Sequence, residues 1–203
     1  MVIGLCGAGG TGKGTLMKAL QEHGGYPFFV LPSPVEETGK RIAPDSKSYS
    51  DMLNSQKVIL QYSALIAQMH SERVATMNGQ HSISERSVLD FLPYMQEFLE
   101  SCPAKDTTWL YEYGFYERMV KQYLSNGIYD VLIYVPIEFE PSAQDLKTNS
   151  WKEREGKRRR QTDRKIQELL KWVEENTQIK IVRVCGSVSE RLKQVQEVIS
   201  MAG

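Results

Sequence analysis

Nine consecutive residues near the start of the chain, GAGGTGKGT, have the composition of a phosphate-binding loop. Five of them are glycines, which are costly in regular elements, so the backbone here must bend unusually. The spacing fits G-x-x-x-x-G-K, in which backbone N–H groups surround phosphate oxygens and the lysine reaches the β- and γ-phosphates. A hydroxyl at the start of the following helix can bind Mg²⁺. We therefore expect Lys13 to be catalytic, Thr15 to bind the metal, and the nucleotide triphosphate to contact Gly7, Ala8, Gly9, Gly10, Thr11, Gly12, Lys13, Gly14 and Thr15. The alternative is a glycine-rich turn that binds nothing.

A second candidate set follows a short apolar run and reads Ser84-Glu85-Arg86-Ser87. A carboxylate can accept a proton or hold Mg²⁺, and an arginine can bind phosphate through two parallel hydrogen bonds. We interpret Glu85 and Arg86 as catalytic residues, with Glu85 also a metal ligand. The alternative is a helix start in which Ser87 is the N-cap and the two charged side chains are exposed.

A third candidate set is a strongly basic run. Ten basic residues against four acidic ones lie between residues 147 and 171, although the whole chain balances 25 Lys and Arg against 25 Asp and Glu. A solvated helix face is the commonest meaning of such a run. A nucleic-acid-binding stripe is the rival, but no aromatic residues alternate with the basic ones. Arginines that stabilise a transferring phosphoryl group are the third possibility, with Arg158 and Arg160 as catalytic candidates, Arg154 for the nucleotide, and Arg159 as a further candidate.

The elements that must position these residues alternate along the chain. Apolar runs predict five strands, at residues 2–6, 26–31, 81–85, 129–135 and 179–185. Helical periodicity predicts helices at 15–23, 52–77, 88–100, 108–125, 163–176 and 187–199, and residues 35–50 are expected to be irregular. This order predicts an α/β three-layer sandwich with a five-stranded, mainly parallel sheet, formed by one domain over residues 1–203.

Composition excludes several classes of protein. The 203 residues are 41% hydrophobic and 25% charged, which is typical of a folded protein and not of a disordered one. No apolar run approaches the roughly 20 residues that span a bilayer. Cys6, Cys102 and Cys185 have no metal-ligand spacing and fit free thiols in a reducing compartment. With no signal peptide in view, we expect a cytoplasmic protein.

The motifs together resemble the P-loop nucleoside and nucleotide kinases. The form GxxxxGKGT resembles the adenylate-kinase-like loop, and Glu85-Arg86-Ser87 resembles the motif that ends the same strand in deoxynucleoside and thymidylate kinases. The order over most of the chain is similar to the ribosylnicotinamide-kinase-like group, which is sometimes placed among AAA-domain proteins. This resemblance implies ATP and Mg²⁺ as cofactors and an arginine-bearing lid, here within about residues 136–164.

The resemblance also implies an acceptor site, and here the chain departs from the pattern. Related kinases usually carry an acidic base just after the second strand, where this chain has Ser33. Glu36 or Glu37 takes that role, or Glu85 does, or the acceptor is a phosphate that needs no base. The residues assigned to the acceptor are Glu36, Glu37, Gln61, Arg86 and Asp90.

The resulting prediction is an ATP- and Mg²⁺-dependent phosphotransferase acting on a nucleoside or nucleoside monophosphate. The alternative is a P-loop ATPase coupled to a protein or nucleic-acid partner. No membrane partner is expected, nucleic acid is the less favoured partner, and helices 52–77 and 108–125 are candidates for joining two copies into a homodimer, as in dimeric nucleoside kinases.

Overall fold

The computed structural model describes residues 1–23, 28–47, 49–100, 107–139 and 156–202. Its centre is a five-stranded sheet with the order β2-β3-β1-β4-β5, in which every neighbouring pair is parallel. The predicted α/β class and parallel sheet are therefore confirmed. The strands are β1 (Val2–Cys6), β2 (Phe29–Leu31), β3 (Ser82–Ser84), β4 (Val131–Tyr134) and β5 (Lys180–Arg183).

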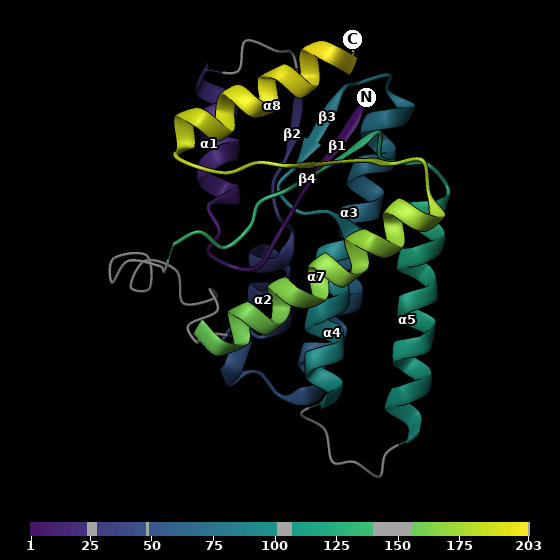
Figure 1. Ribbon diagram of the computed structural model, residues 1–203. Coiled ribbons are helices and arrows are strands. Elements are labelled where there is room, and N and C mark those ends of the chain that lie inside the picture. The colour runs from purple at the N-terminus through teal and green to yellow at the C-terminus, as the bar shows by residue number, and fades with distance from the viewer. Residues whose placement is uncertain (24–27, 48, 101–106, 140–155, 203) are drawn as a thin grey trace.

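Helices cover both faces of the sheet, as Figure 1 shows. One face carries α1 (Lys13–His23) and α8 (Val188–Ala202), which pack against each other. The other face carries α3 (Asn54–Met77), α4 (Phe91–Glu100), α5 (Thr107–Ser125) and α7 (Gly156–Asn176). The short elements are α2 (Val35–Ile42), η1 (Tyr49–Asp51) and η2 (Val88–Asp90).

Alternation along the central strands explains why two cores form. Ile3 and Leu5 of β1 belong to the core under α1 and α8, whereas Val2 and Cys6 belong to the core under the other helices. Successive side chains of a strand point to opposite faces, so a central strand covered on both sides must be apolar throughout. This is why the sequence of β1, VIGLC, is a continuous apolar run.

The structure differs from the prediction most clearly in two helical segments. Residues 35–42 are expected to be irregular but form α2, which begins after Pro34 and is supported by i,i+4 ion pairs from Glu36 to Lys40 (2.7 Å) and Glu37 to Arg41 (3.6 Å). The helix expected from residue 163 begins at Gly156. Consequently part of the segment proposed as a lid is helical, and residues 140–155 of it lie outside the described residues. Within the described ranges, no helix has the length and apolar character that a membrane span requires.

Candidate phosphate-binding and phosphoryl-transfer site

The glycine-rich loop joins the carboxyl end of β1 to the first turn of α1. Its path requires left-handed or strained backbone at Gly7 (φ +148°), Gly10 (φ +70°) and Gly12 (φ +93°). A Cβ at Gly7 would also lie 2.3 Å from the carbonyl oxygen of Val135, so no other residue fits there. The loop leads into the first turn of α1, whose backbone N–H groups have no acceptor within the helix. This is where phosphate-binding loops hold their phosphate.

Lys13 lies folded over this loop and is only 6% exposed. Its Nζ donates hydrogen bonds to the carbonyl oxygens of Gly7 and Ala8, the second at 2.9 Å. Burial lowers the pKa of Lys13, and the nearby Asp90 carboxylate opposes that shift. The ammonium is therefore held at the loop by two carbonyls and one buried carboxylate.

Asp90 supplies that carboxylate from η2 and has no exposed surface. One of its oxygens accepts a hydrogen bond from the backbone N–H of Gly7 at 3.0 Å, and the other lies 3.8 Å from Lys13 Nζ and 4.0 Å from the Arg86 guanidinium. Burial raises the pKa of Asp90, against the lowering effect of its two cationic neighbours. The sequence assigns Asp90 to the acceptor, whereas the structure places it beneath the loop, where it holds the backbone and the lysine.

Glu85 and Arg86 arrive at the loop from the end of β3. A Cβ on Gly14 would lie 2.9 Å from Glu85 Oε1, so the missing side chain makes room for the carboxylate beside the first turn of α1. The other carboxylate oxygen accepts a hydrogen bond from the Ser33 N–H at 3.2 Å, and Arg86 Nε donates to Ser33 Oγ at 3.1 Å. The structure thus joins the end of β2, the end of β3 and the loop into one site.

The donor set at this point fits Mg²⁺. Thr15 is exposed in the first turn of α1, and the Glu85 carboxylate lies against the neighbouring Gly14. Hydroxyl and carboxylate oxygens are ligands that Mg²⁺ accepts, and the ion usually completes its shell with water and substrate phosphates. Among the described residues there is no cluster of three or more His, Cys, Asp or Glu side chains able to hold a metal without such help.

The sequence pattern favours Arg158 and Arg160 as catalytic candidates, but Arg159 is the arginine of α7 that lies against the loop. Arg159 is 1% exposed and donates to the carbonyl oxygens of Gly9 (2.8 Å), Gly10 (2.9 Å) and Phe139 (2.8 Å). Arg158 forms an ion pair with Glu97 of α4, and Arg160 is exposed. Arg154 lies outside the described residues. Since a helix turns by about 100° per residue, three successive arginines point in three directions, and Arg159 is the one that points at the loop carbonyls.

Arg191 at the start of α8 is a loop contact that the sequence analysis missed. It is 2% exposed, donates to the Thr11 carbonyl oxygen at 2.7 Å, and contacts Glu138 at 2.5 Å. Glu138 in turn accepts a hydrogen bond from the Gly186 N–H at 2.8 Å, and its pKa is lowered by the hydrogen bond from Arg191. A single arginine in an amphipathic helix gives no sequence signal for this role.

The remaining acceptor candidates are spread over other elements. Gln61 is buried on α3, with its amide 3.4 Å from the Tyr49 hydroxyl and its backbone carbonyl accepting from Tyr116 at 3.1 Å. Glu36 and Glu37 are exposed on α2 and are engaged by its own basic side chains. Their roles at the acceptor stay predictions.

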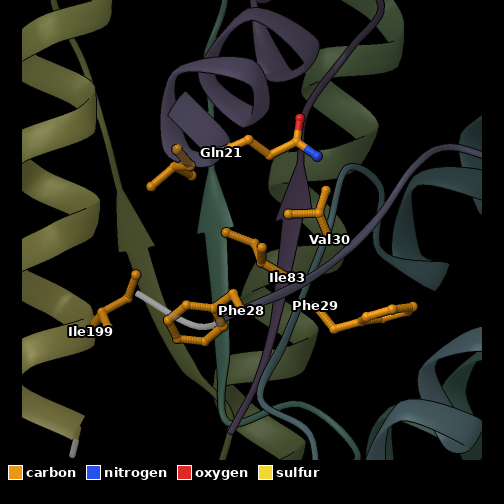
Figure 2. Close-up of a pocket in the computed structure, with 7 residues that line it drawn as sticks. Gln21, Phe28, Phe29, Val30, Ile83 and Ile199 are labelled. Atoms are coloured by element: carbon orange, nitrogen blue, oxygen red, sulfur yellow. The ribbon is translucent and has the colours of Figure 1, made fainter. Parts of the chain in front are cut away.

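A cavity of about 270 Å³ lies apart from these groups, toward the carboxyl end of α1 (Figure 2). Apolar side chains from α1, β2, β3 and α8 dominate its lining, which consists of Leu20, Gln21, Phe28, Phe29, Val30, Ile83 and Ile199. None of these side chains titrates or is nucleophilic, so the cavity brings no reactive group to the site.

Comparison with solved structures shows the same fold in deoxyadenosine kinase from M. mycoides. The structure with bound dATP matches with a TM-score of 0.71 at 17% identity, covering 98% of this chain and 100% of that chain. The structure with products dCMP and a flexible dCDP matches with a TM-score of 0.67 at 18% identity, covering 99% and 100%. The structure with bound dCTP gives a TM-score of 0.64 at 16% identity, with the same coverage of 99% and 100%.

Comparison with protein-family models identifies the family of the chain. No curated protein matches this chain. A family model described as an AAA domain matches residues 2–191, which include the loop, the end of β3 and the arginines of α7 and α8. The chain therefore belongs to this AAA-domain family of P-loop proteins.

Proposed function

We propose that the protein is an ATP- and Mg²⁺-dependent phosphotransferase whose acceptor is a nucleoside or a nucleoside monophosphate. The observation that carries this proposal is the position of Glu85, whose carboxylate lies against Gly14 in the first turn after the loop lysine. A nucleotide-binding loop by itself fits an ATPase equally well. A carboxylate and an arginine placed beside it from a separate strand provide for an acceptor as well as a donor.

Each group of the site has a defined part in this proposal. The loop N–H groups and Lys13 bind the β- and γ-phosphates. To do so, the Lys13 ammonium exchanges its hydrogen bonds to two loop carbonyls for hydrogen bonds to phosphate oxygens. Thr15 and Glu85 would hold Mg²⁺, which supplies charge neutralisation at the phosphates. Arg159 fixes the loop by donating hydrogen bonds to its carbonyls. Arg86 donates a hydrogen bond to Ser33 at the end of β2, which is the side where the acceptor would bind. Catalysis then consists mainly of positioning and electrostatic stabilisation.

The acceptor class is supported by the local chemistry and by the fold. The end of β2 offers the Ser33 hydroxyl in place of a carboxylate, and the Glu85 carboxylate, which is partly exposed, lies beside it and accepts a hydrogen bond from the Ser33 N–H. Glu85 is therefore the base for a hydroxyl acceptor, or the acceptor already carries a phosphate and needs none. Solved structures of the same fold include deoxyadenosine kinase with bound dATP, dCTP or dCMP, so deoxynucleosides and their monophosphates are the first acceptors to test.

An ATP-consumption screen tests the proposal. Purified protein with Mg²⁺ is offered nucleosides, their monophosphates and nicotinamide riboside one at a time, and ADP is measured together with the phosphorylated acceptor. Acceptor-dependent ADP release that is lost in Lys13→Ala supports the phosphotransferase. ADP release at one rate with every acceptor, or release stimulated by a protein or nucleic acid with no phosphorylated small molecule, supports the ATPase instead.

We further propose a homodimer joined through α3 and α5. These helices pack side by side, with the Tyr62 hydroxyl 2.8 Å from a Glu112 carboxylate oxygen. Their outer surfaces carry large exposed apolar side chains, including Ile59 (52%), Ile66 (54%) and Phe115 (53%). Sedimentation of the wild type and of Ile66→Glu checks this: a dimer that becomes a monomer in the variant supports the interface, and a monomeric wild type contradicts it. The cytoplasmic location stays a prediction.

A further inference from the structure

A carboxyl group with no exposed surface lies on α3, apart from the loop and the metal candidates. Glu72 accepts hydrogen bonds on Oε1 from Gln68 Nε2 (2.7 Å), Ser84 Oγ (2.8 Å) and the Tyr129 hydroxyl (2.7 Å). On Oε2 it accepts one from the Tyr123 hydroxyl (3.0 Å). Among the residues that the structure describes, its hydrogen-bond donors are thus one amide and three hydroxyls, and none of the four carries a positive charge.

Stability alone does not account for a carboxyl group in this place. Moving an ionisable group out of water is costly, and apolar residues of the same volume are often as stable as a buried polar cluster. What four directed hydrogen bonds provide is a fixed geometry between the elements that supply the donors. Here the donors come from α3, β3, α5 and the turn before β4, so one carboxyl group determines the relative position of four segments.

Two of these donors hold the segment that carries the site. Ser84 is the last residue of β3 and directly precedes Glu85. The Tyr129 hydroxyl donates to Glu72 and also accepts a hydrogen bond from the backbone N–H of Val88 at 3.0 Å. Glu72 is therefore connected to both ends of the five-residue turn from Ser84 to Val88, within which Glu85 and Arg86 lie. The third hydroxyl, of Tyr123, connects Glu72 to α5 and not to this turn.

We propose that Glu72 is a positioning residue for phosphoryl transfer: through Ser84 and Tyr129 it fixes the turn that presents Glu85 and Arg86 to the phosphate-binding loop. The kinetic consequence rests on the proposed function, whereas the structural consequence does not. The loop itself is carried by β1 and α1, so this role affects the reacting geometry more than it affects nucleotide binding.

Two tyrosines provide a matched pair of variants. Tyr129→Phe and Tyr123→Phe each remove one hydroxyl that donates to the same carboxyl group, and only Tyr129 also contacts the turn. Hydrogen exchange is read at the N–H groups of Glu85 and Asp90, whose acceptors, the Leu31 and Ser87 carbonyls, are untouched by either change. We expect exchange there to rise about tenfold or more in Tyr129→Phe and to change less than about twofold in Tyr123→Phe.

Kinetics with the acceptor found in the screen give the second readout. We expect Tyr129→Phe and Glu72→Gln to lower kcat by about 10- to 100-fold with KM for ATP within about twofold, because a displacement of about 1 Å at the reacting groups costs that much. Tyr123→Phe should retain kcat.

The proposal is overturned when all variants lose kcat and exchange protection in proportion to their fall in Tm, or when Tyr129→Phe behaves like Tyr123→Phe. The two tyrosine variants decide the matter even where Glu72→Gln fails to fold. A wild type without acceptor-dependent activity overturns the proposed function, and the exchange experiment still decides the role of Glu72.

Discussion

Replacing Asp90 by Asn removes one negative charge from beneath the phosphate-binding loop and keeps the shape of the side chain. The remaining side-chain oxygen can still accept from the Gly7 N–H, now 3.0 Å away, but the ammonium of Lys13 loses the carboxylate at 3.8 Å. Breaking a buried ion pair by removing one partner costs about 3–5 kcal/mol. Since Lys13 keeps two carbonyl acceptors and the Gly7 contact survives, we expect a loss of about 2–3 kcal/mol in the free energy of unfolding.

The pH dependence of this loss follows from the lysine. Burial already lowers the pKa of Lys13, and Asp90 is the group that opposes this most, so Asp90→Asn lowers it further. Between that lowered value and the ordinary value of 10.5, the unfolded chain binds more protons than the folded one, and stability rises with pH. The deficit of Asp90→Asn relative to the wild type should therefore shrink between pH 7 and pH 10.

Urea unfolding followed by circular dichroism at both pH values measures the deficit. Asp130→Asn is the matched control, because Asp130 also accepts from a backbone N–H beside β1 (Val2, 2.6 Å) but its side chain is 58% exposed, and we expect it to cost less than about 1 kcal/mol. Adding Lys13→Met to Asp90→Asn should relieve part of the loss. If Asp90→Asn costs no more than Asp130→Asn, or if its deficit is the same at both pH values, Asp90 and Lys13 do not form a stabilising buried ion pair.

Three further changes separate groups that the sequence alone cannot distinguish. Arg159→Ala should lower the free energy of unfolding by about 2 kcal/mol or more, since it leaves three carbonyl contacts unmade. Arg164→Ala, which removes only an exposed ion pair with Glu168, should stay within about 0.5 kcal/mol, and equal Tm shifts would contradict this. Gly14→Ala places a Cβ 2.9 Å from Glu85 Oε1, so Mg²⁺-dependent turnover should fall about tenfold with Tm nearly unchanged, and unchanged turnover would count against Glu85 as a ligand. Burial raises the pKa of Glu72 above its ordinary 4.5, so above pH 4.5 the folded chain binds more protons than the unfolded chain. The wild type should therefore lose stability relative to Glu72→Gln as pH rises from 5 to 8. A constant difference in urea unfolding would show that the group does not titrate there.

The phosphate-binding loop and the sheet were predictable because their signals are local. The glycines and Lys13 follow a buried apolar run and precede a helix, and this spacing is required by the phosphate chemistry itself. The alternation of apolar runs and helical periodicity was enough to predict the α/β class with a mainly parallel sheet. Even so, α2 was missed, because it is only eight residues long, although Val35, Thr38 and Ile42 recur at helical spacing along it.

The choice among neighbouring side chains was decided by tertiary structure. Three arginines in a row look alike in the sequence, but the start and the packing of α7 decide that Arg159 reaches the loop carbonyls while Arg158 meets Glu97. The contact of Arg86 with Ser33 spans 53 positions of sequence and exists because β2 and β3 are parallel neighbours whose carboxyl ends meet.

The sequence by itself therefore determined the donor side of the site, where consecutive residues share one loop and one helix end. The tertiary structure alone decided the rest: that Asp90 lies beneath the loop, that Glu85 fits beside Gly14, and that Glu72 connects four segments. The physical reason is that a buried polar group must find partners wherever the packed chain supplies them, and in this fold those partners come from distant segments.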